Sequence, residues 1–449
     1  MALPLAYQKN IFLRYYYMPT KLSRYIKLHQ SSDDKDSLLF FSTKNAAAGL
    51  IPSSLISDIE KDKLTKKDKE TLLNLGFLVH SLAEEQQEIL SFFHDVNNVD
   101  QSFKYVVVLN LDCNLGCKYC FEGKRKGKFH LSKETADQFV NFAIKRSDLL
   151  NKDQIKFVFY GGEPLLSLET IIYISKKMRV YAERKAVKYN FTLVTNGTLL
   201  TSEIVKKLTP LGLQGAKVTL DGPKYIHDRY RPFKSGSGSF DVIVNNIKKT
   251  STMTRVQIGG NYTQDHYREF PLLLDFLSEN GLTPDRIPIV KFDPVISESS
   301  EFAPPDFHDG CESPNEPWIA EATLFLREEI LRRGYRTQKI MPIPCMVELI
   351  NSFVVNYDGT LYKCPGMIGR KNCCIGNVTD GLIDYNKSHG IDAWKNEECL
   401  ACSFLPLCFG GCKYMKLIRT GEMNGVICQK EYFEKTLGAL VAQDIKYNL

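Results

Sequence analysis

Residues 105–122 read YVVVLNLDCNLGCKYCFE, an apolar run that breaks into a loop with three cysteines. Cys113, Cys117 and Cys120 have the spacing C-x3-C-x2-C, and Tyr119 directly precedes the last of them. Four cysteine ligands close a zinc site or a four-iron cluster, so three neighbouring thiolates leave one coordination position open. This set favours an iron–sulfur cluster that binds a small molecule at its fourth iron. The alternative is a zinc loop, which usually pairs two C-x2-C knuckles.

Strand-like and helix-like segments alternate from this loop to residue 296. The alternation predicts parallel βα units, in an α/β fold whose functional residues lie at the carboxyl ends of the strands. Ser132 and Thr201 are expected to cap helices, and Gly281 to end one. We expect strands at 105–111, 155–160, 189–195, 215–220, 255–262 and 287–293, and helices near 132–149, 167–186, 201–210, 240–250 and 267–280.

Glycine-rich turns with polar residues follow several of these strands. The second strand ends in YGGEP (160–164), where two glycines allow close backbone approach to a ligand and a glutamate adds an acceptor. The third and fourth strands end in TNG (195–197) and TLDGP (219–223), and the fifth passes GGN (259–261). Taken singly, the Asn-Gly and Asp-Gly pairs are equally explained as turns. The stretch HDRYRPFKSGSGSF (227–240) holds an arginine that could bind a ligand carboxylate or form a surface ion pair.

A second group of cysteines lies in the C-terminal region. Clustering of this kind in an intracellular chain favours metal binding over disulfides, with a zinc ribbon as the alternative. The segment FVVNYDGTLYKC (353–364) predicts a hairpin that turns at Asp358-Gly359. The seven regularly spaced cysteines are Cys345, Cys364, Cys399, Cys402, Cys408, Cys412 and Cys428.

The three-cysteine loop and the strand-end turns together resemble the radical S-adenosylmethionine (SAM) family. The resemblance implies a partial (β/α)6 barrel over residues 99–296, with Cys113, Cys117 and Cys120 on a [4Fe–4S] cluster whose fourth iron is chelated by SAM. Reductive cleavage of SAM would then give a 5′-deoxyadenosyl radical that abstracts a substrate hydrogen. The SAM-binding residues that the resemblance implies are Tyr119, Gly161, Gly162, Glu163, Asn196, Thr219 and Arg231, with Gly259, Gly260 and Asn261 beside the adenine.

The C-terminal spacing resembles the SPASM extension of the same family, here expected over 344–449 after a bridging region at 297–343. The resemblance implies two auxiliary [4Fe–4S] clusters, hence three clusters in all. The first would be one protein ligand short, and Cys311, Cys373, Cys374 or a substrate thiolate could complete it. The implied ligands are Cys345, Cys364 and Cys412 for the first auxiliary cluster, and Cys399, Cys402, Cys408 and Cys428 for the second.

Residues 1–98 predict a small N-terminal domain and a linker. Segments 23–28 and 37–43 are typical of a hairpin, with a turn at 31–34; short helices are expected in 51–61 and 65–76, a strand at 77–79 and a polar linker at 84–101. The pattern is similar to the winged-helix-like domains that bind leader peptides in enzymes that modify ribosomal peptides, where the leader adds as a strand to a sheet edge. The alternative is a stabilising domain without a partner.

Composition sets outer limits on the function. The chain has 449 residues, which suggests two or three domains, and its 24% charged and 43% hydrophobic residues are ordinary for a globular protein. The net charge of +6 is mild, so a nucleic-acid partner is not expected. Lys9 and Arg14 interrupt the apolar N-terminus and no long apolar run occurs, so we expect a cytoplasmic protein without a signal peptide or membrane contact.

The full pattern resembles a radical SAM/SPASM maturase of ribosomally made peptides, of the geopeptide-maturase type. It implies a precursor peptide with a leader as substrate, a cysteine sulfur-to-carbon thioether as product, and an external electron donor such as flavodoxin or ferredoxin. One alternative is sulfatase-maturase-like oxidation of cysteine or serine to formylglycine. A zinc-binding module without catalysis is the alternative of another class.

Overall fold

The computed structural model of the protein describes residues 19–30, 34–98, 102–150, 153–298, 307 and 309–449. The expectation about a signal peptide at the N-terminus, and the parts of the predicted turn and linker at 31–33 and 99–101, lie outside the described residues. Within the described ranges, no helix is both long and apolar enough to cross a membrane.

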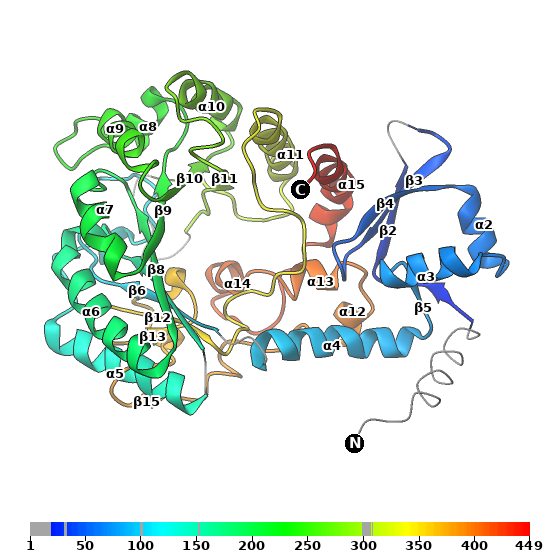
Figure 1. Ribbon diagram of the computed structural model, residues 1–449, viewed down its shortest axis with the longest axis horizontal. Helices are drawn as coiled ribbons and strands as arrows, with labels where there is room; N and C mark the ends of the chain where they lie inside the picture. The colour runs from blue at the N-terminus through cyan, green and yellow to red at the C-terminus, as the bar shows by residue number, and fades with distance from the viewer. Residues whose placement is uncertain (1–18, 31–33, 99–101, 151–152, 299–306, 308) are drawn as a thin grey trace.

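Six parallel strands in chain order form the centre of the molecule (Figure 1). Each lies within three residues of its expected bounds, which confirms the α/β fold, and the open sheet is consistent with a partial barrel. Neighbouring strands pair in parallel throughout. The strands are β6 (Ser102–Val108), β7 (Gln154–Tyr160), β8 (Lys188–Thr195), β9 (Leu213–Thr219), β10 (Arg255–Tyr262) and β11 (Ile289–Pro294).

Helices cover the outer face of this sheet (Figure 1). Ser132 and Thr201 cap two of them as expected, because their hydroxyls accept the backbone N–H of Thr135 and Ile204. Gly281 has a left-handed φ of 71° one residue after the cap of α10, which confirms it as a helix stop. The helices are α5 (Lys133–Leu149), α6 (Leu168–Lys185), α7 (Ser202–Leu208), α9 (Phe240–Thr250) and α10 (Phe270–Glu279), with a short α8 (Lys224–Tyr230) that was not expected.

Strand β6 is buried on both faces, and its two faces belong to different cores. Tyr105 and Val107 pack under the barrel helices, whereas Val106 and Val108 pack with residues of the C-terminal region. Alternate side chains of a strand point to opposite faces, so a strand between two cores reads as a continuous apolar run. The apolar run that begins at Tyr105 is therefore continuous because each face of the strand is buried against a different layer.

The predicted C-terminal hairpin forms and also extends the barrel sheet. Its first strand, β12 (Ser352–Val355), pairs in parallel with β6, and β13 (Leu361–Tyr362) pairs antiparallel with β12. The central sheet therefore has eight strands in the order β11-β10-β9-β8-β7-β6-β12-β13. The remaining elements of this part are α11 (Pro317–Arg332), β14 (Gly376–Asn377), β15 (Gly381–Leu382), α12 (Glu397–Leu400), α13 (Leu405–Cys408), α14 (Lys413–Thr420) and α15 (Lys430–Lys446).

The N-terminal domain is a three-stranded antiparallel sheet with two short helices. The predicted hairpin is confirmed as β2 (Ile26–Gln30) and β3 (Ser37–Ser42), and β4 (Ala48–Pro52) adds a third strand. Since the order is β2-β3-β4, the outer strands of this small sheet are β2 and β4. The expected helices are α2 (Ser54–Glu60) and α3 (Lys66–Asn74), and the expected return strand β5 (Leu78–Val79) pairs with β1 (Lys21–Leu22).

The expected linker at 84–101 is wrong over its described part, because Leu82–Asn98 form the helix α4. Ile89 and Phe93, four residues apart, are buried on one face of this helix. The Phe93 ring lies 4.9 Å from that of the fully buried Trp394 in the C-terminal region. Helix α4 therefore docks the N-terminal domain onto the cysteine-rich region. The prediction was wrong because the segment is mostly polar and its apolar stripe is narrow.

Candidate active site

A cavity of about 340 Å³ opens at the carboxyl ends of the barrel strands. Almost every residue proposed for the site lines it, although the contributing segments are far apart in sequence. This convergence agrees with the rule that strand ends of parallel α/β folds carry function. The expected residues on its wall are Cys113, Cys117, Tyr119, Cys120, Gly161, Gly162, Asn196, Thr219, Arg231, Gly259, Gly260 and Asn261.

The cysteine loop is held in place by backbone and side-chain hydrogen bonds. The Cys113 sulfur accepts the N–H of Leu115 at 3.4 Å and the amide of Asn196 at 3.7 Å. Burial raises the pKa of the Cys113 thiol to about 11 and also raises that of Cys120. Metal ligation requires thiolates, so loading this site releases protons.

The two glycines of the YGGEP turn allow the ends of β6 and β7 to approach each other. A β-carbon on Gly162 would lie 2.2 Å from the carbonyl oxygen of Asp112, and one on Gly161 would lie 2.6 Å from that of Asn110. Gly161 also has a φ of 150°. The sequence predicts that the backbone of this turn comes close to a ligand. In the structure the turn comes close to the backbone that leads into the cysteine loop, and this contact keeps the thiols near the strand end.

Glu163 does not line the cavity, in contrast to the other residues proposed for SAM. Its side chain is fully buried, and its carboxylate accepts the Thr195 hydroxyl at 2.7 Å, the Asn196 N–H at 2.8 Å and the Leu165 N–H at 3.0 Å. Burial raises the pKa of Glu163, while these three donors oppose the shift. The carboxylate therefore ties β7 to the end of β8.

A buried network positions Tyr119 at the cavity wall. Its hydroxyl donates to the Asp221 carboxylate and accepts from Arg231 at 2.8 Å and from Asn261 at 3.1 Å. Asp221, which is 1% exposed, also accepts the Asn261 N–H at 2.7 Å. The motifs at the ends of β9 and β10 are thus joined to the cysteine loop through one phenol.

Sequence reasoning missed three charged residues that line the cavity, Glu122, Lys126 and Lys217. Glu122 is 3% exposed, and burial raises its pKa to about 7. Burial lowers the pKa of Lys126, but the neighbouring thiols of Cys120, Cys117 and Cys113 raise it by more, so the pKa lies above its usual value. The sequence did offer a signal for Glu122, because it is a charged residue only two positions after Cys120, within the stretch 105–122.

Two of the C-terminal cysteines, Cys364 and Cys408, each lie near several other thiols, and their assignment to clusters stays a prediction. Burial, then the charges of Cys412 and Cys345, raise the pKa of Cys364. Burial, then Cys402, Cys399 and Cys428, raise that of Cys408 to about 12. Of the spare cysteines, Cys373 adds to the charge around Cys364, and Cys311 packs with the partly buried Cys412.

Tyr160, the last residue of β7, lies between the two thiol regions. It lines the cavity and also packs against the core that contains Cys345, Cys364 and Cys412. Burial, then the charges of Glu122, Cys120 and Cys364, raise its pKa. Among the described residues no three ligand side chains converge closely enough to hold a single metal ion. The cluster assignments therefore stay predictions.

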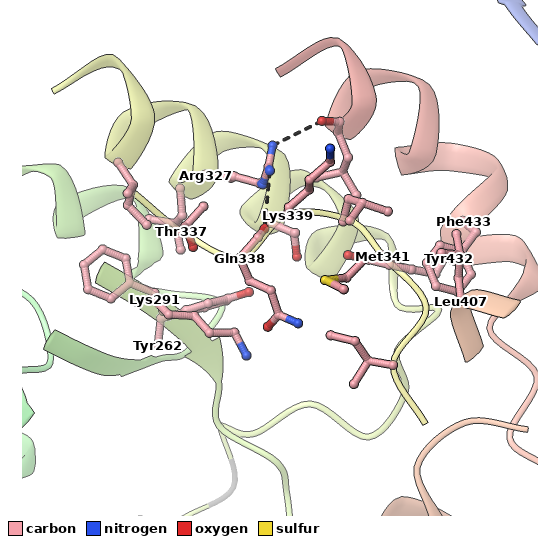
Figure 2. Close-up of a pocket in the computed structure, with 17 residues that line it drawn as sticks. Tyr262, Lys291, Arg327, Thr337, Gln338, Lys339, Met341, Leu407, Tyr432 and Phe433 are labelled. Carbon is pink, nitrogen blue, oxygen red and sulfur yellow. Dashed lines mark hydrogen bonds between the residues drawn. The ribbon is translucent and has the colours of Figure 1, made fainter. Parts of the chain in front are cut away.

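A second cavity, of about 270 Å³, lies between β11, α11, the segment 337–343 and α15 (Figure 2). No residue proposed for the site lines it. Figure 2 shows the guanidinium of Arg327 reaching from α11 towards α15, where it donates to the Leu440 carbonyl at 3.1 Å. The same guanidinium also donates to the Asp444 carboxylate and to Gln443 at 3.0 Å. The pair Arg327–Asp444 is almost completely buried and fixes α15 against the barrel.

The open parallel α/β sheet and the three-cysteine loop at its carboxyl edge agree with the comparison of families, in which the model of the radical SAM superfamily matches residues 107–259. The chain thus contains a radical SAM domain and is an enzyme, and this domain implies a [4Fe–4S] cluster and SAM. The three thiols and the glycine-lined approach at the cavity fit such a group.

The chain is homologous to anaerobic sulfatase-maturating enzymes. It is 26% identical over 378 residues to the cysteine-type enzyme of Clostridium novyi, covering 75% of this chain and 96% of that one. It is 22% identical over 403 residues to the radical SAM cyclopropyl synthase TigE of Paramaledivibacter caminithermalis, covering 81% and 77%.

Two solved structures share the fold. The enzyme anSMEcpe with bound AdoMet and Kp18Cys peptide has a TM-score of 0.62 at 21% identity, covering 78% of this chain and all of that one. Streptococcus suis SuiB bound to its precursor peptide SuiA has a TM-score of 0.53 at 14% identity, covering 91% and 99%. The likeness to SuiB thus spans more of this chain.

Proposed function

We propose that this enzyme modifies a ribosomally synthesised precursor peptide, joining a cysteine sulfur to a carbon as a thioether. The observation that carries the proposal is the N-terminal sheet domain, which docks on the cysteine-rich region through α4 and lies in addition to the barrel. The alignment with the sulfatase-maturating relative leaves a quarter of the chain uncovered, whereas the fold likeness to the peptide-bound SuiB covers 91% of it.

The N-terminal domain is proposed to bind the leader of the precursor. Strands β2 and β4 are the outer strands of its sheet, and an extended peptide can add to such an edge through backbone hydrogen bonds. The Tyr25 hydroxyl donates to the Leu400 carbonyl at 3.3 Å and the Thr43 hydroxyl to that of Ser403 at 2.7 Å, which fixes the domain to the cysteine-rich region. A bound leader would then be held at a constant distance from the clusters.

The proposed chemistry assigns a role to each part of the cavity. Cys113, Cys117 and Cys120 would hold the cluster, and the bound cluster and SAM together supply a 5′-deoxyadenosyl radical. Formation of the thioether removes one hydrogen atom from the target carbon and one proton from the thiol, together with one electron. The auxiliary cysteines beside Tyr160 offer an acceptor site for that electron, and flavodoxin or ferredoxin is the proposed external donor.

Two auxiliary clusters complete the proposal. Cys345, Cys364 and Cys412 would hold the first, and the remaining position would take Cys311, Cys373, Cys374 or the substrate cysteine, whose thiol coordination would deprotonate to the thiolate. The second would have four ligands, Cys399, Cys402, Cys408 and Cys428.

The test is an anaerobic reaction of the iron-loaded enzyme with SAM, reductant and a short cysteine-bearing peptide encoded beside its gene. The product should be lighter by two hydrogen atoms and should no longer react with iodoacetamide. The Cys113→Ala/Cys117→Ala/Cys120→Ala variant should lose about four iron atoms and all deoxyadenosine formation. Active SAM cleavage with an unchanged peptide mass would count against the proposal.

Formylglycine formation is the second candidate, favoured by the homology to sulfatase-maturating enzymes. The same assay separates the two reactions. Oxidation of a cysteine to formylglycine replaces sulfur by oxygen and gives an aldehyde that reacts with hydrazides, whereas a thioether keeps the sulfur and gives no aldehyde.

A further inference from the structure

A short basic segment overlaps the end of the cysteine loop and carries most of the net charge of the chain. Residues 118–133 contain six lysines and arginines and one acidic residue, hence a net charge of +5, against +6 for all 449 residues. The acidic residue, Glu122, is buried. The positive charge of the protein is therefore concentrated beside the three cysteines, and the rest of the chain is close to neutral in sum.

The lysines of this segment point both inward and outward. Lys126 is directed inward, where its ammonium forms a hydrogen bond with the thiol of Cys120. Lys124, Lys128 and Lys133 are exposed to solvent. A lysine ammonium in water is charged at neutral pH. Positive charges thus stand in solvent about one lysine side chain away from the thiols that would hold the cluster.

Phe129 adds an exposed aromatic ring between these lysines in the sequence. Its side chain is 48% exposed, and its ring stacks on that of Tyr357 at 5.3 Å. The Phe129 carbonyl accepts the N–H of Leu111, two residues before Cys113, at 3.0 Å. One backbone hydrogen bond therefore joins this exposed residue to the strand end that leads into the cysteine loop. We call Lys124, Lys128, Phe129 and Lys133 the lysine surface.

The acidic residues beside the lysine surface have other roles. Glu134 lies in the first turn of α5, where the helix N-terminus stabilises a negative charge. The Asp358 carboxylate accepts the Asn356 amide and the Thr360 N–H, both at 3.0 Å. Within the described part of the chain, the three exposed lysines form no ion pair. Their charges are therefore available to a partner.

Transient interfaces for electron transfer are small, and the charges on their rim set the rate of encounter. We propose that the lysine surface is the docking site of a flavodoxin, a small acidic protein that delivers the electron for SAM cleavage. The acidic residues of the flavodoxin face the lysines, and the apolar edge of its flavin contacts the Phe129 ring. One electron passes from the flavin hydroquinone to the [4Fe–4S]²⁺ cluster, which leaves a flavin semiquinone and a [4Fe–4S]⁺ cluster with no proton transferred. This docking site rests on the external donor of the proposed function and is independent of the peptide reaction.

Anaerobic mixing of flavodoxin hydroquinone with the iron-loaded enzyme and SAM, without peptide, tests the site, because the flavin absorbance reports each electron transferred. Lys124→Gln/Lys128→Gln/Lys133→Gln should slow this second-order reaction about 10-fold at low salt and raise the Kd of oxidised flavodoxin, measured by calorimetry, by a similar factor. Both differences should shrink at about 1 M salt, where the Debye length is about 3 Å. The matched control is Lys206→Gln/Lys207→Gln/Lys249→Gln, three exposed lysines on α7 and α9, which should behave as the wild type.

Reduced methyl viologen, a small cationic donor that needs no docking site, separates docking from damage at the cluster. It should reduce the lysine variant at least as fast as the wild type, and iron content should be unchanged. Phe129→Ala should raise the flavodoxin Kd about 5-fold or more and leave the viologen reaction unchanged. A lysine variant that flavodoxin reduces as fast as the wild type, or that both donors reduce more slowly, overturns the docking site.

Two further outcomes concern the identity of the partner. A wild-type enzyme that methyl viologen reduces but flavodoxin does not would overturn the proposed donor and this docking site together, while the peptide reaction could still be assayed with the chemical donor. Faster reduction of the wild type by an acidic ferredoxin than by flavodoxin would overturn the choice of flavodoxin, because the contact between the flavin edge and Phe129 would then have no role.

Discussion

Glu163 offers the sharpest test of how the site is built, because its carboxylate faces the chain and not the cavity. Glu163→Ala would leave the buried N–H groups of Leu165 and Asn196 without an acceptor, while the Thr195 hydroxyl can rotate to another partner. Each orphaned N–H costs about 1–3 kcal/mol, so the variant should lose about 2–6 kcal/mol of stability. Glu163→Gln keeps one acceptor oxygen and relieves the burial of a charge, so its loss should be clearly smaller.

The assay is anaerobic urea unfolding of the iron-loaded enzyme, followed by circular dichroism, with SAM affinity measured on the same samples. Asn196 donates to Asn114 of the cysteine loop at 2.8 Å, so a displaced β8 end should weaken SAM binding in proportion to the lost stability. Glu279→Ala, an exposed carboxylate at the end of α10, serves as the control and should change neither. A Glu163→Ala enzyme of wild-type stability that no longer binds SAM would refute the reasoning, because the carboxylate would then act on the cofactor.

Three further predictions concern packing and protonation. Asp444→Ala leaves the buried Arg327 guanidinium without its counter-charge and should cost about 3–5 kcal/mol in urea unfolding, whereas replacing both residues by Leu and Met should cost much less. Burial and Arg231 hold the pKa of the fully buried His227 well below its usual range, so the unfolded chain takes up a proton first as pH falls below about 6.5. His227 should therefore lower the stability by up to about 1.4 kcal/mol per pH unit there, and His227→Gln should reduce the slope by that share, while His29 and His389, whose pKa values burial also lowers, keep theirs. Gly162→Ala places a β-carbon 2.2 Å from a backbone oxygen of the cysteine loop, so iron content after reconstitution should fall while far-UV dichroism is retained.

The barrel could be predicted from sequence because each of its strands and helices is specified locally. Apolar runs of strand length alternate with helical periodicity, and Ser132 and Thr201 mark helix starts by side-chain caps. The site followed from the same reasoning, since parallel strands bring their carboxyl ends to one edge.

Features that depend on pairing between distant segments could not be predicted. The hairpin at 353–364 was foreseen, yet nothing local in its sequence indicates that β12 joins β6, some 250 positions earlier. The helix α4 was missed because its buried stripe has only two apolar members, Ile89 and Phe93, between the polar Glu85 and Asn97. The sequence also could not predict that the Glu163 carboxylate binds groups of the chain and does not face the cavity. Its donors at the end of β8 lie near it only in the folded structure.

Strand β6 explains how one barrel positions two sets of thiols. Its loop carries the three cysteines of the cavity, and its inner face, Val106 and Val108, packs on the core that holds Cys345, Cys364 and Cys412. Because β12 pairs directly with β6, the hairpin that delivers Cys364 is hydrogen-bonded to the strand that delivers Cys113. The separation of the two thiol sets is thus set by a sheet register, which resists change far better than a flexible linker would. A peptide held by the N-terminal domain would meet both sets at fixed distances, as a reaction that takes a hydrogen atom at one site and an electron at the other requires.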